Sequence, residues 1–143
     1  MISEKSCGAV VFTRDGGDIK YVIIHAKNGD YGFPKGHVEN LETELQTAHR
    51  EVMEETGLRV DFLEGFCEEF SYTFKRGAKT VTKQVVYFLA EFSEQTPVFQ
   101  ESELVGIKLL DFDKAMKMLR FDNAKRTLQK ANDFLIKQAL LPH

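Results

Sequence analysis

Apolar residues near the start of the chain form two short continuous runs separated by a polar stretch. The first run covers residues 6–13, SCGAVVFT, and the second covers residues 19–26, IKYVIIHA. Residues 14–18 contain two glycines that permit a tight turn, so the pattern predicts a β-hairpin. Because residues 9–12 and 22–24 are continuously apolar, we expect both strands to be covered on both faces, as in a sheet between helices.

The spacing becomes helical over residues 44–56. Thr43, followed three residues later by Gln46, forms a capping box, and Gly57 is a C-terminal stop signal. At about 100° per residue, the helix separates into two neighbouring arcs. One arc is expected to pack on the interior and the other collects carboxylates: Leu45, Ala48, Val52 and Thr56 form the first, and Glu51, Glu54 and Glu55 the second.

A second hairpin is predicted after this helix. Residues 58–74 carry spaced aromatic and aliphatic side chains, with Gly65 as a bend or bulge. Residues 80–92, TVTKQVVYFLAEF, have the β-branched and aromatic content of a strand. The basic turn of residues 75–79 joins the two segments.

The last third of the chain predicts a loop, a strand and two helices. The loop covers residues 91–103, the strand residues 104–110 and the first helix residues 111–119. Asp122 is expected to cap the final helix. One stripe of that helix should pack on the sheet and consists of Ala124, Leu128, Ala131 and Leu135.

These elements predict an α/β protein with one domain over residues 1–143. The composition, 43% hydrophobic and 29% charged, is ordinary for a globular protein. We expect no signal peptide, and no apolar run approaches the ~20 residues of a membrane span. We therefore expect a cytoplasmic protein with no membrane partner, in which Cys7 and Cys67 are buried free thiols. The oligomeric state is left open by the sequence.

Negative charge is concentrated in residues 36–58. This stretch holds six glutamates and one arginine, a net charge of minus five in a chain whose total is minus three. A solvated acidic helix face is one explanation. Because the carboxylates lie next to the packing arc, a second explanation is a site for a hard divalent cation such as magnesium. The negative total and the lack of a broad basic stripe argue against nucleic acid as the main partner.

The segment GFPKGH, residues 32–37, leads into this acidic region. Pro34 restricts its own backbone and the residue before it, so Lys35 and the Gly36 carbonyl are held in a defined direction. Lys35 is a candidate phosphate contact beside a metal site, with a solvated lysine as the alternative. Lys83 and the basic turn of residues 75–79 offer further positive charge to a polyanion, or form an ordinary solvated turn.

Residues 36–58 match every fixed position of the Nudix box: Gly36, then Glu42 after five residues, then REVMEETGL beginning at Arg50 after seven more. The chain therefore resembles Nudix hydrolases, which cleave nucleoside diphosphates linked to a further group. The resemblance implies the Nudix fold, an α/β/α sandwich with a central mixed β-sheet flanked by helices. It also implies magnesium-dependent hydrolysis, with manganese as a substitute. The implied metal ligands are the Gly36 carbonyl, Glu51, Glu54, Glu55 and Glu103.

The resemblance also implies catalytic roles. Arg50, which stays protonated, would fix Glu51 by a charge-assisted hydrogen bond. The general base is either a box glutamate, such as Glu51 or Glu55, or Glu103 from the loop before the last strand.

Within the Nudix family, the whole chain resembles the asymmetrical diadenosine tetraphosphate hydrolases of animals and archaea, which implies a dinucleoside polyphosphate substrate cleaved to ATP and AMP. This resemblance rests on short matches that include CGAVVF, PKGHVE and VYFLAE. It implies that Tyr87 and Phe121 stack on an adenine and that Tyr72 also contacts the substrate. For Phe121, core filling is the alternative.

Several other functions stay open. Another Nudix substrate could be the 5′ end of RNA, a diphosphoinositol polyphosphate, ADP-ribose or an oxidised nucleotide. A nucleotide-sensing module without catalysis is a further alternative, although the intact set of Arg50, Glu51, Glu54 and Glu55 argues against it.

Overall fold

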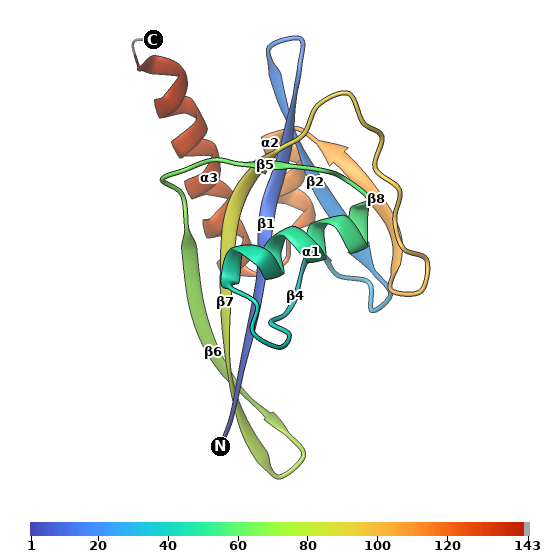
Figure 1. The fold of residues 1–143 in the computed structure, drawn as a ribbon, viewed down its shortest axis with the longest axis vertical. Helices are drawn as coiled ribbons and strands as arrows, with labels where there is room; N and C mark the ends of the chain where they lie inside the picture. The colour runs from blue at the N-terminus through green and yellow to red at the C-terminus, as the bar shows by residue number, and fades with distance from the viewer. Residues whose placement is uncertain (142–143) are drawn as a thin grey trace.

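The computed structural model describes residues 1–141 as an eight-stranded mixed sheet between helices (Figure 1). The strands are β1 (Ile2–Asp15), β2 (Asp18–Ala26), β3 (Tyr31–Gly32), β4 (Lys35–His37), β5 (Asp61–Phe62), β6 (Glu68–Arg76), β7 (Lys79–Glu91) and β8 (Leu104–Leu110). The helices are α1 (Glu44–Thr56), α2 (Phe112–Met118) and α3 (Asp122–Leu140). The predicted α/β/α architecture is confirmed.

Strands β1 and β7 form the centre of the sheet and run parallel to each other from the Ile2–Val81 pair to the Phe12–Glu91 pair. Strand β2 continues the sheet beside β1, with the two-residue turn Gly16–Gly17 between them, and β8 lies on the far side of β2. Strand β6 pairs antiparallel with β7. Both predicted hairpins are therefore confirmed.

Alternating residues of the central strands fill two separate layers. One layer joins β1, β2 and β7 to α2 and α3, and its fully buried members include Val10, Tyr21, Leu89, Leu128 and Leu135. The opposite layer joins the same strands to α1 through Ala9, Val11, Val22, Val52 and Ala90. Because both faces are covered, the strands read as continuous apolar runs in the sequence.

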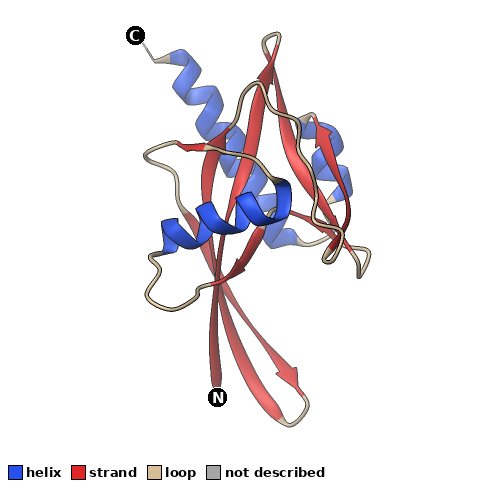
Figure 2. Ribbon diagram, turned by 45° about the vertical axis from the view of Figure 1, so that its right-hand side comes forward, coloured by secondary structure: helices blue, strands red, loops and turns tan. Residues whose placement is uncertain are grey.

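The start of β1 and the β6–β7 hairpin extend together beyond the helices (Figures 1 and 2). Here Glu4 pairs with Lys83 in the parallel ladder, and its carboxylate accepts a hydrogen bond of 2.8 Å from Arg76 at the hairpin end. The guanidinium of Arg76 also lies over the ring of Phe74, 5.4 Å from its centroid.

Within the described residues, no helix is long and apolar enough to cross a bilayer.

Several local predictions were wrong. Leu45 is 44% exposed, whereas Thr47 is buried in its place. The N-cap of α3 is Phe121, with no side-chain hydrogen bond, and Asp122 is the first residue of the helix. Cys67 is exposed, while Cys7 is buried, and both thiols are free.

The predicted bend at Gly65 agrees with the structure. A turn around Gly65, whose φ is +94°, divides the apolar segment after α1.

Candidate active site

Helix α1 carries two buried carboxylates on the side that faces the sheet. Its ends are fixed as the sequence predicts, by reciprocal Thr43–Gln46 capping hydrogen bonds and by Gly57 in the left-handed conformation. Glu51 is 9% exposed and Glu55 is 6% exposed, although a buried carboxylate is costly without a cation or hydrogen-bond donors. Their placement indicates a functional site.

Arg50 is the centre of an ion-pair network beside these carboxylates. Its Nη1 donates to Glu51 Oε1 at 2.8 Å, and its Nη2 donates to the His37 carbonyl at 2.9 Å. Its Nε donates to Glu42 Oε2 at 2.7 Å, and Glu54 lies at 3.3 Å from Nη1. Arg50 thus orients Glu51, as expected, but it is held in place by Glu42, which had no predicted role.

Glu42 is itself firmly fixed. The Arg50 guanidinium, helped by hydrogen bonds from the Glu39 backbone N–H and the Thr47 hydroxyl, lowers the pKa of Glu42 to about 2. Thr47 Oγ1 donates to Glu42 Oε1 at 2.9 Å. Thr47 is therefore buried as part of this network.

Gly36 lies directly against Glu51. It belongs to β4, where it pairs with Cys7 of β1, and a Cβ at this position would overlap the carboxylate of Glu51. Only glycine allows this approach of backbone and carboxylate. The contact places the Gly36 peptide next to Glu51, which together with Glu54 and Glu55 forms what we call the acidic cluster.

Glu55 lacks the partners that a buried carboxylate needs. Its Oε2 is buried and accepts no hydrogen bond from any residue in the described part of the chain. Burial, together with the negative charges of Glu51 and Glu103, raises the pKa of Glu55 to about 8. Glu103, in the loop before β8, is therefore near enough for its charge to affect Glu55.

These residues fit a divalent cation. An unpartnered buried oxygen on Glu55, a second buried carboxylate on Glu51 and the adjacent Gly36 backbone supply the hard oxygen donors that such an ion prefers. Residues 1–141 contain no three acidic, histidine or cysteine side chains already arranged as a ligand set. Glu54, half-exposed, interacts with Arg50 instead. Glu54 could join these donors only if its side chain turned away from Arg50.

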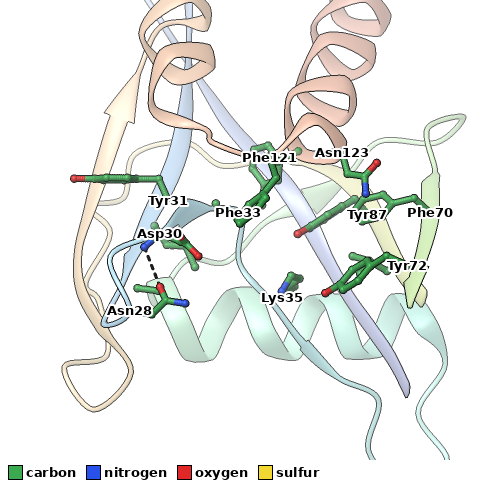
Figure 3. A pocket seen from close by; sticks show the side chains of 15 residues that line it. Asn28, Asp30, Tyr31, Phe33, Lys35, Phe70, Tyr72, Tyr87, Phe121 and Asn123 are labelled. Atoms are coloured by element: carbon green, nitrogen blue, oxygen red, sulfur yellow. Dashed lines mark hydrogen bonds between the residues drawn. The ribbon is translucent and has the colours of Figure 1, made fainter. Parts of the chain in front are cut away.

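A pocket of about 520 Å³ lies on the other side of β4, between the sheet and the start of α3 (Figure 3). We call it the aromatic pocket. Its rings come from Tyr31, Phe33, Phe70, Tyr72, Tyr87 and Phe121, and its polar groups from Asn28, Asp30, Lys35 and Asn123. The buried Tyr87 contacts Phe33 edge-on, with ring centroids 5.3 Å apart. Phe121 is 51% exposed, so it is available to a ligand and is not core filler.

Lys35 connects the aromatic pocket to the acidic cluster. It lines the pocket and is adjacent in sequence to Gly36, which touches Glu51. Burial and the positive charge of Lys83 lower the pKa of Lys35, while the charges of Glu55 and Glu51 oppose that change. A phosphate chain crossing from the pocket to the acidic cluster would pass this ammonium group.

The structure brings most of the predicted site residues together. Four of the five predicted substrate contacts line the aromatic pocket: Lys35, Tyr72, Tyr87 and Phe121. Lys83 does not line it, but lies near enough to affect Lys35. The basic turn is occupied by other contacts, since Arg76 pairs with Glu4 and Lys75 donates to Thr80.

Some pocket residues gave no signal in the sequence. Asn28 and Asp30 belong to a loop whose glycine and polar residues predict only a turn. Asn123 lies in the first turn of a helix for which the sequence predicts only a buried stripe. The one available hint for Phe33 was its position before Pro34.

Comparison with known proteins agrees with this geometry. The model of the NUDIX domain matches residues 4–130. Bis(5′-nucleosyl)-tetraphosphatase [asymmetrical] of Rattus norvegicus is 33% identical over 143 residues, which cover 92% of this chain and 95% of the relative. The corresponding Caenorhabditis elegans protein is 29% identical over 133 residues, covering 92% and 96% of the two chains.

Solved structures show the same fold. A crystal structure of a binary complex of C. elegans Ap4A hydrolase has a TM-score of 0.84 at 26% identity and covers 94% of this chain and 98% of its own. The NUDIX domain of Shewanella oneidensis NrtR complexed with ADP ribose has a TM-score of 0.72 at 22% identity, with coverage of 94% and 90%. The domain match, the fold and the acidic helix together show that this chain belongs to the Nudix family.

Proposed function

We propose that this protein is a magnesium-dependent hydrolase that splits diadenosine tetraphosphate asymmetrically into ATP and AMP. Nudix hydrolases act on nucleotides with divalent metals, and the relatives named above carry the more specific activity in their names. Magnesium is the proposed cation and manganese its substitute. The free thiols Cys7 and Cys67 agree with a cytoplasmic setting.

The observation that carries this proposal is the common border of the acidic cluster and the aromatic pocket at β4. A dinucleoside polyphosphate has flat apolar bases at its ends and a highly charged chain between them. The rings of Tyr87 and Phe121 suit a base, because aromatic stacking accepts any π-face. Lys35 suits the phosphates next to the base.

The proposed reaction is attack of water on one phosphorus of the chain. A new phosphorus–oxygen bond forms, the bond to the leaving nucleotide breaks, and a proton of the water passes to a carboxylate. A divalent cation, when bound, supplies positive charge that offsets the charge on the phosphate oxygens. Glu51, Glu55 and the Gly36 carbonyl would hold it, with Glu54 and Glu103 as further ligands.

Other residues of the chain position these groups. Arg50 holds the Glu51 carboxylate in one orientation by the hydrogen bond of 2.8 Å, and Glu42 fixes Arg50 in turn. Lys35 neutralises the phosphate nearest to the pocket. The base that accepts the proton from water is either a box glutamate, Glu51 or Glu55, or Glu103. The two box glutamates are buried, whereas Glu103 is exposed but near enough for its charge to affect Glu55.

Product analysis tests the proposal. Purified protein with magnesium should convert diadenosine tetraphosphate into equal amounts of ATP and AMP, separated by chromatography. A panel of ADP-ribose, oxidised nucleoside triphosphates, a diphosphoinositol polyphosphate and RNA with a 5′-triphosphate should react far more slowly. The proposal is wrong if the dinucleotide stays intact while a panel member is consumed. Binding of the dinucleotide without turnover, at any magnesium concentration, would instead indicate a sensor.

A further inference from the structure

A rigid turn forms one wall of the aromatic pocket. In the loop of residues 27–30, the Ala26 N–H donates to the Asp30 carbonyl at 2.9 Å and the Gly29 N–H donates to the Ala26 carbonyl at 3.0 Å. The Asp30 N–H donates to Asn28 Oδ1 at 2.9 Å (Figure 3). Gly29, with φ of +97°, permits this closed turn. The loop therefore presents the side chains of Asn28 and Asp30 in fixed positions.

The Asp30 carboxylate has unused capacity to accept hydrogen bonds. Its side chain is 32% exposed and lines the pocket. Arg120 Nη1 lies 3.4 Å from Oδ1, but the arginine side chain is 74% exposed and such a surface pair is weak. Within residues 1–141, Asp30 Oδ2 accepts no hydrogen bond. A carboxylate offers about four acceptor positions and no donor when ionised.

Asn28 complements this acceptor with a donor. Its Oδ1 is engaged by the Asp30 N–H, so its amide NH₂ group is left to donate. Figure 3 shows Asn28 and Asp30 on one side of the pocket, Tyr72 and Tyr87 on the other, and Phe33 and Phe121 between them. A base stacked on Phe121 and Tyr87 would turn an edge toward the acceptor and donor of the loop across the pocket.

Purine edges differ in the groups that they would present there. Guanine offers two adjacent N–H groups, N1–H and N2–H, next to the O6 acceptor. Adenine offers one N6–H beside the N1 acceptor. Xanthine has a carbonyl oxygen in place of the guanine amino group, and this oxygen would face the carboxylate without a proton between them.

We propose that Asp30 reads the edge of the base in the aromatic pocket by accepting N–H groups, so that the pocket rejects a purine such as xanthine, which presents a carbonyl oxygen in their place. The inference rests on the proposed function, because it assumes that the pocket holds a nucleobase. Asp30 acts on specificity and takes no part in the attack on phosphorus.

The test is calorimetric binding of GMP, AMP and XMP to the whole protein. The wild-type chain should bind GMP at least tenfold more tightly than XMP, since a site built to accept an N–H strongly rejects an analogue that lacks it. Asp30→Asn keeps the shape but exchanges one acceptor for a donor. In this variant the ratio of GMP affinity to XMP affinity should fall about tenfold or more. The affinity for AMP should fall less, because the amide oxygen still accepts N6–H.

Two variants control for indirect effects. Arg120→Gln removes the ion pair and keeps the carboxylate, so it should retain the GMP preference. Asp18→Asn makes the same chemical change at the exposed β1–β2 turn and should leave all three affinities unchanged. The inference fails if Asp30→Asn leaves the GMP-to-XMP ratio unchanged, if Arg120→Gln lowers it equally, or if the wild-type chain binds none of the three ligands.

A parallel assay of diadenosine tetraphosphate hydrolysis separates the two hypotheses. If the wild-type chain cleaves this substrate but Asp30→Asn leaves the base preference unchanged, the inference alone is contradicted. A chain that leaves the substrate intact, yet changes its base preference with Asp30→Asn, contradicts the proposed function alone.

Discussion

Replacing Glu55 by glutamine should stabilise the metal-free protein and at the same time abolish its activity. The folded protein raises the pKa of this carboxyl from 4.5 to about 8, chiefly by burial. The folded state therefore binds the proton more tightly than the unfolded state, and the free energy of unfolding falls as the pH rises from about 4.5 to about 8. At about 1.4 kcal/mol per pKa unit, the total loss is on the order of 5 kcal/mol.

Urea unfolding with a chelator present, at pH 5.5 and pH 8.5, measures the larger part of this loss. The wild-type protein should be markedly less stable at the higher pH, and Glu55→Gln, which carries no ionisable group, should lose much less. Magnesium should restore the stability of the wild-type protein at pH 8.5. In the hydrolysis assay, loss of a metal ligand should reduce kcat by about a thousandfold or more.

Glu54→Gln is the matched control for stability, because the same change on the same helix affects a half-exposed side chain. It should leave the pH dependence of the wild-type protein in place. Equal pH dependence in the wild-type and Glu55→Gln proteins would refute the reasoning that Glu55 is the costly buried carboxylate. Full activity of Glu55→Gln would remove this residue from the site.

Three further substitutions probe the rest of the site. Phe121→Ala should raise KM about tenfold with little change in kcat or thermal stability, since base stacking contributes about 1–3 kcal/mol and this ring is half-exposed; an unchanged KM would contradict the stacking role. Gly36→Ala should reduce activity about a hundredfold or more and weaken magnesium binding measured by calorimetry, because the added methyl group overlaps Glu51, and normal magnesium affinity would contradict this. Glu42→Gln should lower kcat with little effect on KM, because Arg50 loses its strongest partner, and a wild-type kcat would show that Glu51 is oriented without it.

The course of the backbone was largely predictable from the sequence, because local signals agree with the final environment. The capping box at Thr43 and the glycine stop at Gly57 are local, and both occur as predicted. The face of α1 was harder to predict. Hydropathy assigned Leu45 to the interior, whereas the interior arc contains Thr47, Glu51 and Glu55, since it serves the site as well as the core.

The acidic cluster was predictable and the pocket only partly so. Glu51 and Glu55 belong to a long motif with fixed spacing, so one segment of sequence is sufficient to find them. The pocket joins β6, β7, the β2–β3 loop and the start of α3, which are far apart in the chain. Asp30 carries no motif and becomes visible only when the fold brings it opposite Tyr87.

The parallel pairing of β1 with β7 also constrains the order of folding. Ile2 lies opposite Val81, so nearly eighty residues, including the whole of α1, must be synthesised before the first strand has its partner. Contacts between such distant segments form slowly, because the loop between them must close first. Helix α1 packs on this central pair, so part of the surface that holds it, including Ala90 and Phe92, comes from the second half of the chain. We therefore expect the acidic cluster to assemble late, and variants that weaken β7 to delay the appearance of activity during refolding.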